Sequence, residues 1–509
     1  MSVNNNTVRT TEIKPVETEV TKSKKQESRD FSHGRFKKQT GKIKVECLGR
    51  AASEVTQSIY QLTAGDRRII LDYGLYQSSD LVESYKVNHS VIKEISPKKI
   101  DFILISHANI DHCGALPVLY GRGCTAPIYV ARGNKDLIRL MLYDSAKIMQ
   151  SDVIKMTNEG YDKACPLYGS NEIERCLSFM FERDMDEEFS LCHGIVCEFT
   201  SAGHIVNSAQ IRLTFNFDGL IKRIHYTGDI GSPYIGKYYV SPFEAPDKCD
   251  LLIGECTYSG ENRNHSVRDR EKDVEKIEAI IQNTCVENGG KVLIPVFALD
   301  RLQTLLTVLY DVFERCGFDV PVLVDTPLGE SVCDIWGKII SRDKEKWLDV
   351  ISWDRLNFAI DYTDSQSWQN SDKPAVILAS SGMCNNGRSV SWVKTLLPGD
   401  NNHILFCGYS AVDTIATAIK DGQNNRFLKI DGVLTPNKCG VTILNSFSSH
   451  ACRSELMEIY GKAQYSKLLL VHSDFDSKCV FAEELRGVIA DDGRTSAVVV
   501  ANKGLSLNV

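Results

Sequence analysis

Short apolar segments recur along the chain from Ile43 onwards, and several of them end in glycine, aspartate or histidine. Examples are IKVECLG, RRIILDYG, DFILISH and DLLIGEC. These runs are rich in β-branched and aliphatic residues, which is typical of buried strands. Strands of this kind, separated by turns and by helical segments such as residues 136–149, predict a layered α/β fold in which helices cover sheets.

A second and more regular pattern begins near Glu261. A polar helix at residues 266–288 leads to the apolar run KVLIPVFA, and an amphipathic helix at residues 300–316 leads to PVLVDT. Two further strands, VILASSG and HILFCGY, follow. Strand–helix–strand alternation at this spacing predicts a parallel, doubly wound sheet. Short strands return after Leu434.

The composition is that of an ordinary globular protein, with 43% hydrophobic and 25% charged residues. No window approaches the ~18 consecutive apolar residues of a membrane span, so we expect no membrane association. The first residues contain no apolar segment of the kind found in secretory signals. The 17 cysteines are scattered and form no C-x-x-C pair. We therefore expect reduced thiols and a cytoplasmic location.

Charge is unevenly distributed along the chain. Residues 1–42 carry ten Lys/Arg and five Asp/Glu, which gives this segment a net charge of +5. The whole chain has a net charge of −7, so the remaining residues carry −12. We predict that this segment is a disordered basic tail, with a nucleic-acid-binding arm as the alternative. The acidic remainder argues against non-specific binding of duplexes.

Histidine and carboxylate side chains gather where predicted strands end. Five of the eleven histidines and two carboxylates lie at or just after such an end: His107, His112, His204, His450, His472, Asp229 and Glu255. Apolar strands that bring imidazole and carboxylate groups to one sheet edge can build a metal site on a rigid scaffold. A buried structural role is the alternative for any single histidine, and we expect it for His225.

The most informative motif lies within DFILISHANIDHCGALP, residues 101–117. In this turn His107 and Asn109 can point one way while Asp111 and His112 point towards a neighbouring position. One loop could thus provide ligands to two metal ions. Further ligands would come from TSAGH and YTGD, and a carboxylate such as Asp229 can bridge two metals with its two oxygens.

The sequence resembles the metallo-β-lactamase-fold nucleases that carry a β-CASP domain. Their H-x-H-x-D-H signature appears as HANIDH and is followed by TSAGH and YTGD in the same order. Motifs A, B and C of the family match LLIGECTY, LNSFSSH and LLLVHS, and two internal β-CASP segments match KVLIPVFALDRLQ and ILASSGMCNNGR. Upstream, Asp72 in IILDYGLYQ occupies the position of the aspartate that supports the metal ligands.

The resemblance implies a fold and a domain order. The fold is α/β: a four-layer αββα metallo-β-lactamase sandwich with an inserted doubly wound β-CASP domain. After the tail at 1–42, the metallo-β-lactamase domain would comprise residues 43–259 and 436–509. The β-CASP domain would comprise residues 260–435.

The resemblance also implies two divalent metal ions, most simply Zn²⁺, with Mn²⁺ as the alternative. Their ligands fall into two groups that are joined by one bridging carboxylate: His107, Asn109 and His204; Asp111, His112 and His472; and Asp229. The metal pair would generate a hydroxide nucleophile near neutral pH and hold the phosphate oxygens for in-line attack. The metal-binding carboxylates Asp111 and Asp229 are therefore expected to be catalytic.

Motifs A and B imply the remaining catalytic groups. Glu255 would orient His450, and protonated His450 would act as the general acid on the leaving oxygen. Ser448 and Ser449, on the same loop as His450, are expected to reach the scissile or a flanking phosphate. Arg388 is a candidate phosphate contact, with a solvated arginine at a helix start as the alternative.

Motif C favours RNA as the substrate. The RNA-processing branches of the family have histidine at the position of His472, whereas the DNA-repair branch typically has valine. We therefore expect a ribonuclease. The layout, which lacks the long extra C-terminal domain of some 5′-exonucleases of the family, favours an endonuclease that acts on single-stranded RNA. A homodimer is considered as a further option. A DNA-acting nuclease, a catalytically degenerate scaffold subunit of an RNA-processing complex and a small-molecule hydrolase are the alternatives.

Three residues depart from the family pattern. Asn109 replaces a histidine, and because a neutral amide oxygen is a poorer zinc ligand than imidazole, the first metal should bind more weakly. This replacement is the only support for the scaffold alternative. Asp300 replaces the glycine that is usual in FALDR, and we expect it to cap the following helix. Cys452 replaces an aspartate and is expected to be packed.

Overall fold

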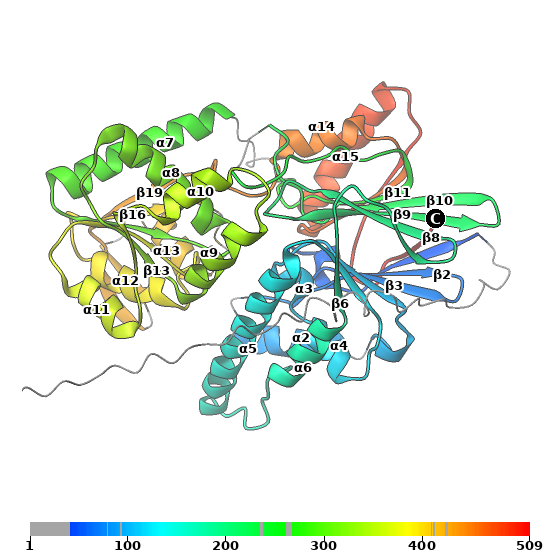
Figure 1. The fold of residues 1–509 in the computed structure, drawn as a ribbon, viewed down its shortest axis with the longest axis horizontal. Helices are drawn as coiled ribbons and strands as arrows, with labels where there is room; N and C mark the ends of the chain where they lie inside the picture. Colours follow the sequence, from blue (N-terminus) through cyan, green and yellow to red (C-terminus); the bar gives the residue numbers. More distant parts are fainter. Residues whose placement is uncertain are drawn as a thin grey trace, which may run out of the picture.

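The computed structural model describes residues 41–509 except 79, 92–93, 235–237, 261–266, 409, 411–412, 423–425 and 431. The predicted basic tail therefore lies outside the described residues, apart from its last two positions. The described chain folds into three sheets covered by helices and a two-stranded hairpin (Figure 1).

The first sheet has seven strands in the order β22-β1-β2-β3-β4-β5-β6. Neighbours are antiparallel from β22 to β3 and parallel from β3 to β6. Its strands are β1 (Ile43–Cys47), β2 (Ile59–Ala64), β3 (Arg67–Tyr73), β4 (Phe102–Ile105), β5 (Ile128–Ala131), β6 (Met180–Arg183) and β22 (Ser506–Asn508). The helices that follow its strands are α2 (Leu81–Val91), α3 (Ile110–Cys113), α4 (Leu116–Gly121), α5 (Asn134–Asn158) and α6 (Ser170–Ser178).

The second sheet also has seven strands, in the order β21-β20-β11-β10-β9-β8-β7. They are β7 (Phe189–Cys192), β8 (Ile195–Ser201), β9 (Ala209–Phe217), β10 (Leu220–Tyr226), β11 (Cys249–Glu255), β20 (Tyr465–Val471) and β21 (Ala497–Val500). Helices α14 (Arg453–Lys462) and α15 (Phe475–Asp491) cover its outer face (Figure 1).

Alternating apolar residues pack these two sheets against each other. In β2 and β3, Leu62 and Leu71 point inwards and join Leu213 and Ile253 of the second sheet in one buried cluster. The residues on the opposite faces pack on helices, as Ile103 does on the first sheet. Because each sheet buries both faces, its central strands read as continuous apolar runs. The layers are therefore helix, sheet, sheet and helix.

The third sheet has six strands in the order β14-β13-β15-β12-β16-β19, and all of its neighbouring pairs are parallel. Its strands are β12 (Lys291–Pro295), β13 (Val322–Asp325), β14 (Leu356–Phe358), β15 (Ala375–Ala379), β16 (His403–Phe406) and β19 (Gly440–Ile443). Its helices are α7 (Val267–Ile281), α8 (Arg301–Cys316), α9 (Pro327–Ile339), α10 (Lys344–Ile351), α11 (Tyr362–Asn370), α12 (Arg388–Leu396) and α13 (Ile415–Asp421).

Both faces of the third sheet are covered by helices, which makes it doubly wound. One face packs on α8 and α9, and the other packs on α12 and α13. The predicted fold class, a four-layer sandwich with an inserted doubly wound domain, is confirmed.

A short hairpin follows the third sheet's last helix. It consists of β17 (Phe427–Ile430) and β18 (Val433–Pro436), which pair antiparallel. The next strand, β19, hydrogen-bonds to β16 at the edge of the third sheet, although it lies beyond residue 435. The domain boundaries drawn from the sequence therefore stay a prediction.

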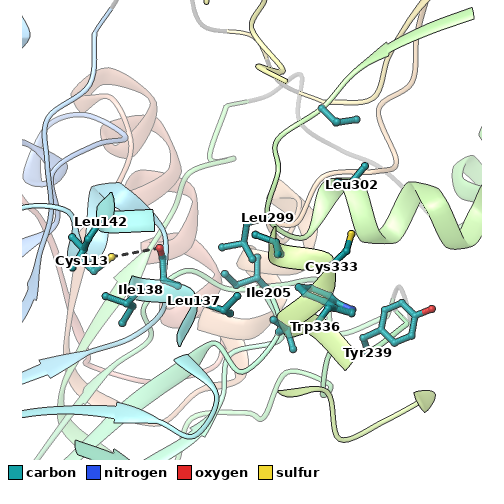
Figure 2. Close-up of a cluster of buried hydrophobic side chains, with 14 of the residues drawn as sticks. Cys113, Leu137, Ile138, Leu142, Ile205, Tyr239, Leu299, Leu302, Cys333 and Trp336 are labelled. Carbon is teal, nitrogen blue, oxygen red and sulfur yellow. Dashed lines mark hydrogen bonds between the residues drawn. The ribbon is translucent and has the colours of Figure 1, made fainter. Parts of the chain in front are cut away.

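An apolar core joins the inserted domain to the first helical layer. Figure 2 shows Leu137 of α5 and Ile205 beside Leu299, Leu302 and Trp336 of the inserted domain. All of these side chains are buried and belong to the same cluster. Ile205 directly follows the predicted ligand His204, so the contact between the domains reaches the site.

The cysteines and the helices bear on the expectations of reduced thiols and of no membrane association. All 17 cysteines fall within the described residues, and none of them forms a disulfide there. In that same part of the chain, no helix is both long and apolar enough to cross a membrane.

The interdomain core predicts a large effect of truncating Trp336, which is fully buried. We expect Trp336→Ala to lower the free energy of unfolding by about 3–5 kcal/mol, because it removes apolar contacts and leaves a cavity. Chemical denaturation measures this loss. Leu348→Ala is the control, since Leu348 is 62% exposed and should change stability by less than about 0.5 kcal/mol. Equal effects of the two variants would contradict the interdomain core.

Candidate metal centre

The candidate ligands lie at the carboxyl ends of strands from both sheets of the sandwich. His107 follows β4 of the first sheet, whereas His204, Asp229 and His472 follow β8, β10 and β20 of the second sheet. Strands β8, β10 and β20 run in the same direction, since β8 and β10 are each antiparallel to β9 and β11 is parallel to both β10 and β20. Their carboxyl ends therefore meet at one edge of the sheet.

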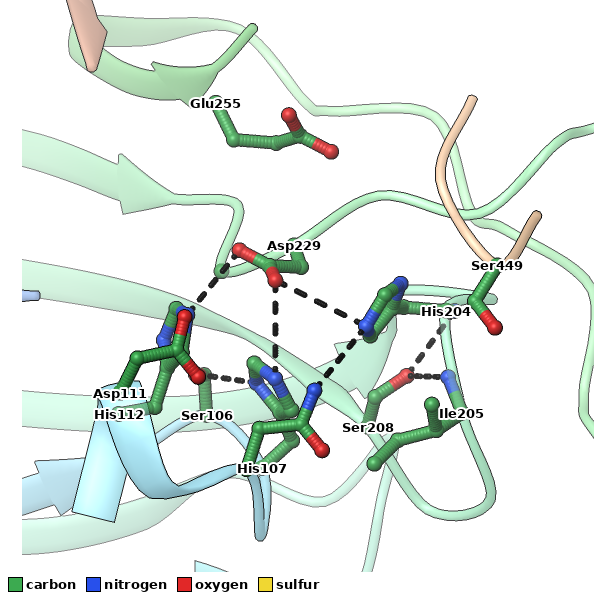
Figure 3. A network of polar contacts seen from close by, with 12 residues as sticks. Ser106, His107, Asp111, His112, His204, Ile205, Ser208, Asp229, Glu255 and Ser449 are labelled. Atoms are coloured by element: carbon green, nitrogen blue, oxygen red, sulfur yellow. Dashed lines mark hydrogen bonds and ion pairs between the residues drawn. The ribbon is translucent and has the colours of Figure 1, made fainter. Parts of the chain in front are cut away.

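The first group of ligands comprises His107, His204 and Asp229. All three are at least 98% buried, and their ligand atoms lie within 4.8 Å of one another. The Nε2 atoms of both histidines lie 3.7 Å from Oδ2 of Asp229. Figure 3 shows the two imidazole rings converging on this carboxylate.

The second group comprises Asp111, His112 and His472. Oδ2 of Asp111 lies 3.6 Å from Nε2 of His112 and 3.4 Å from Nε2 of His472. The other oxygen of Asp229, Oδ1, lies 3.2 Å from Nε2 of His112. Asp229 thus faces one group with each of its oxygens. These distances of 3.2–3.6 Å match a tetrahedral zinc site, in which two ligand atoms are ~3.4 Å apart when their bonds to zinc are ~2.1 Å long.

The donor atoms fit metal ions because buried polar atoms point at the centre and have few partners other than one another. Within the described chain, Nε2 of His107 is buried and makes no hydrogen bond, and buried Nε2 of His112 and Oδ1 of Asp229 face each other at 3.2 Å. Incompletely satisfied buried polar atoms cost free energy unless a ligand satisfies them. The centre of the site is therefore suited to a metal ion.

The opposite ring nitrogens are held by outer partners. Nδ1 of His112 lies 2.7 Å from Oδ2 of Asp72, and Nδ1 of His107 lies 3.0 Å from Oγ of Ser106. Nδ1 of His472 lies 2.9 Å from Oγ1 of Thr257. Such contacts orient an imidazole and direct its other nitrogen towards a metal.

The charges of the site are strongly coupled. Burial, together with the neighbouring His112, lowers the pKa of His107 to about 4, so this imidazole is neutral at neutral pH. Burial disfavours the charged form of His112 as well, but the carboxylates of Asp229 and Asp111 raise its pKa well above the usual value. Divalent cations bound at this site would displace such protons.

Asn109 lies beside the first group. Its side-chain Nδ2 is 3.5 Å from Nε2 of His204, and the residue is only partly buried. Asn109 also precedes α3, where its carbonyl oxygen accepts hydrogen bonds from the amides of His112 and Cys113. The structure thus places the amide next to the predicted first metal position.

The predicted general-acid pair lies beside the first ligand group, with the ring of His450 4.5 Å from that of His204. Nδ1 of His450 is 3.1 Å from Oε1 of Glu255, and Nε2 of His450 is 3.9 Å from Oδ2 of Asp229. Backbone amides of Ile230 and Thr257 donate to the two oxygens of Glu255. The carboxylate is therefore fixed, and it turns the free end of the imidazole towards the candidate metal centre.

The predicted substrate contacts are arranged less uniformly. Ser448 Oγ donates to the Tyr258 hydroxyl, and Ser449 Oγ donates to Oδ2 of Asp300 at 2.7 Å. Both serines lie on the loop of His450.

Arg388 takes a different position from the serines. It begins α12, where its Nε lies 3.4 Å from Asp325 and its guanidinium lies over the Tyr362 ring. In the described chain it makes no hydrogen bond or ion pair with the ligands around Asp229.

The expectation that Asp300 caps a helix is wrong. Asp300 stands at the N-cap position of α8, but its side chain accepts no hydrogen bond from the first turn of that helix. The carboxylate turns instead to Ser449, which belongs to a loop about 150 residues further along the chain.

Several supporting residues were not found from the sequence. Ser106 and Thr257 hold ligand histidines, and Tyr226 donates its hydroxyl to Asp72 at 2.7 Å. Ser106 and Thr257 are each close in sequence to a motif residue, His107 and Glu255, which is the one signal that could have indicated them. Tyr226 is an apolar-strand residue at the end of β10, and nothing in the sequence indicates its contact with Asp72.

Sequence models of three families match the chain in order. They are the metallo-beta-lactamase superfamily at residues 53–168, the Beta-Casp domain at residues 302–419, and the Zn-dependent metallo-hydrolase RNA specificity domain at residues 436–497. Together these matches fall on all three sheets.

Curated relatives align over most of the chain. Transcription termination factor FttA of Methanocaldococcus jannaschii is 28% identical over 471 residues, which cover 87% of this chain and 69% of the relative. Ribonuclease TTHA0252 of Thermus thermophilus is 28% identical over 432 residues, which cover 83% and 92%. Integrator complex subunit 11 of Danio rerio is 28% identical over 445 residues, which cover 85% and 69%.

A solved structure shares the fold. A protein of unknown function from Enterococcus faecalis aligns with a TM-score of 0.52 and 11% identity, covering 92% of this chain and all of the other.

The sandwich fold and its two ligand groups define a metallo-hydrolase of the metallo-β-lactamase type. The chain belongs to the metallo-β-lactamase superfamily, within the group of metal-dependent hydrolases that carry a β-CASP domain. The predicted family is confirmed.

His225 lies near the site in sequence but faces away from it. It is buried, and its Nε2 lies 2.9 Å from Oε1 of Gln210. Burial, with a smaller contribution from Arg212, lowers its pKa to about 3. The imidazole is therefore neutral in the folded protein and gains a proton on unfolding at mildly acidic pH.

This depressed pKa predicts that stability falls as the pH drops below about 6.5, the usual pKa of an unfolded histidine. The loss continues until the folded pKa near 3 is reached. Between pH 7 and pH 5 we expect the wild type to lose about 2 kcal/mol more than His225→Gln. Urea denaturation at the two pH values measures this difference. An identical pH dependence of both proteins would refute a neutral buried His225.

Proposed function

We propose that the protein is a metal-dependent ribonuclease that cleaves single-stranded RNA internally. The observation that carries the proposal is the position of Asp229, whose two oxygens face two separate ligand groups while His450 stands 3.9 Å away. The family description of residues 436–497 names RNA specificity, and one relative is named a ribonuclease. These names support RNA as the substrate class.

Two divalent metal ions, most simply Zn²⁺, are proposed for the two groups, with Asp229 as the shared ligand. His107, His204 and Asn109 would hold one, and Asp111, His112 and His472 would hold the other. When bound, such ions neutralise charge on a phosphodiester and lower the pKa of water. The surrounding carboxylates and histidines, most of which are buried, would hold them in place.

His450 is proposed as the general acid. Its Nδ1 contacts Glu255, so the proton that it gives up would leave from Nε2, which points towards Asp229. A leaving alkoxide placed beside Asp229 would lie within reach of that nitrogen. Proton transfer of this kind accelerates the cleavage of a bond that leaves a basic oxygen.

Substrate binding is proposed for the loop of His450. It is also proposed for Arg388, which begins α12 and, within the described residues, does not contact the ligands around Asp229. Ser448 precedes His450 by two residues, and its hydroxyl donates to Tyr258 and accepts a hydrogen bond of 3.2 Å from the His450 amide. Single-stranded RNA is proposed because its backbone and splayed bases can enter a narrow site that a duplex cannot. A cytosolic location and a homodimer stay predictions.

The bridging position of Asp229 predicts that Asp229→Ala abolishes cleavage. A long single-stranded RNA, labelled at either end, would be incubated with Zn²⁺ or Mn²⁺. We expect internal cuts by the wild type and a loss of at least about 10³-fold in the variant, because both ligand groups lose their shared oxygen donor. Gel analysis of both labelled ends distinguishes internal cuts from terminal trimming.

The alternative hypotheses, a scaffold subunit and a DNA-acting nuclease, each predict a different outcome in this assay. A wild type that leaves RNA intact with both metals, and behaves like the variant, would contradict the proposal and favour the scaffold reading. Cleavage of a matched single-stranded DNA in competition with the RNA would favour the DNA-acting nuclease. Products that arise only from the ends would contradict internal cleavage.

Asn109 predicts that the two metals bind with unequal affinity. The variant Asn109→His replaces an amide with an imidazole beside His204, so we expect its weaker site to bind Zn²⁺ at least about tenfold more tightly. Metal titration of the metal-free protein by calorimetry measures both affinities. Asn109→Ala is the matched control and should weaken the same site or leave it unchanged. Two equal sites in the wild type would contradict the assignment.

A further inference from the structure

The loop that carries the proposed general acid is held from the inserted domain. Residues 445–450 lie between β19 of the third sheet, which ends at Ile443, and α14 of the sandwich, which begins at Arg453. Asp273 of α7 accepts hydrogen bonds from the amides of Asn445 and Ser446 and from the Ser446 hydroxyl. Arg270 donates to the Ser446 carbonyl oxygen. These contacts fix the first half of the loop.

Asp300 contacts the second half of the loop, directly next to His450. The side chain of Asp300 is 97% buried, and its Oδ2 accepts a hydrogen bond of 2.7 Å from the Ser449 hydroxyl. A hydroxyl has a single hydrogen, so this contact directs the Ser449 donor away from the substrate side.

The backbone of Asp300 takes a conformation that disfavours side chains. Its φ is +68° and its ψ is −56°, and the Arg301 amide donates to the Leu299 carbonyl oxygen at 2.9 Å across it. This is the γ-turn with positive φ at its centre, which is rare and strained in residues other than glycine. Strain of this kind is held in place only by surrounding contacts, and the hydrogen bond of the Asp300 side chain with Ser449 is such a contact.

Nearby charges compensate the buried carboxylate. Burial and the neighbouring Arg301 lower the pKa of Arg270 to about 10, whereas Asp300 and Asp273 act in the opposite direction. Asp300 therefore sits in a cationic surrounding, which reduces the cost of burying its charge.

We infer that Asp300 is a positioning residue, which holds Ser449 so that the neighbouring His450 keeps its Nε2 directed at Asp229. This inference rests on the proposed ribonuclease function. On its inner side, the loop is tied by the contact between His450 and Glu255 and by the Ala451 amide, which donates to the Ile230 carbonyl oxygen. The contact with Asp300 ties its outer side. A general acid acts efficiently only when its alignment is maintained.

Two variants separate this role from a merely structural one. Asp300→Gly removes the acceptor and relieves the strain of a positive φ, since glycine has no Cβ. Asp300→Asn keeps an acceptor for the Ser449 hydroxyl, and asparagine tolerates positive φ. Each is compared on RNA and on a nucleoside phosphodiester with a p-nitrophenolate leaving group, which departs without protonation.

For Asp300→Gly we expect kcat on RNA to fall about 10- to 100-fold, because the leaving alkoxide needs a positioned acid. On the p-nitrophenyl ester its kcat should stay within about twofold of the wild type. Asp300→Asn should retain kcat on RNA within about threefold. Ser449→Ala should match the glycine variant, and combining the two should add no further loss.

A positioning role also predicts a change that does not depend on activity. Hydrogen exchange of the amides in residues 445–450 should be faster in Asp300→Gly than in the wild type, while the thermal midpoint stays equal or rises. Equal kcat values of Asp300→Gly and the wild type on RNA would overturn the inference. So would equal losses on both substrates.

The exchange measurement separates the inference from the proposed function. If the wild type cleaves neither substrate, the ribonuclease proposal fails. Unchanged exchange of residues 445–450 in Asp300→Gly then overturns the positioning of the loop as well, whereas faster exchange supports it.

Discussion

The buried carboxylate of Asp229 is the constraint on which the rest of the site depends. It is 98% buried, and its two oxygens face histidines that come from both sheets. A negative charge in this position is stable only with cations around it. Two ligand groups provide that surrounding, and they converge because the sandwich brings the carboxyl ends of β4, β8, β10 and β20 to one edge. The fold and the proposed chemistry thus share one electrostatic requirement.

The inserted domain contacts the same site, although none of the proposed metal ligands comes from it. Its apolar core packs on Ile205, next to His204, and its helices α7 and α8 hold the loop of His450. The third sheet even includes β19, which leads directly into that loop. A contact between domains therefore determines where the proposed general acid stands, and a change in their packing would be felt at Asp229.

The sequence predicted the layers, the doubly wound sheet and most of the side chains that the structure brings together at the candidate metal centre, because strand ends and ligand motifs are local patterns. Contacts between distant segments escaped it. Asp300 was expected to cap α8, since aspartate before a helix usually does, but a tertiary hydrogen bond to Ser449 takes its place. The contact of Arg388 with Asp325 at the end of β13 was not predicted either, and its role as a phosphate contact stays a prediction. Neither partner can be read from neighbouring positions.

Anomalous X-ray scattering at the zinc edge, from crystals grown with Zn²⁺, would reveal whether two metal ions share Asp229. We expect two peaks about 3.5–4 Å apart on either side of the Asp229 carboxylate. One peak should lie among His107 and His204, with lower occupancy because of Asn109, and the other among Asp111, His112 and His472. A single peak that does not contact Asp229, or no peak at either group, would contradict this expectation.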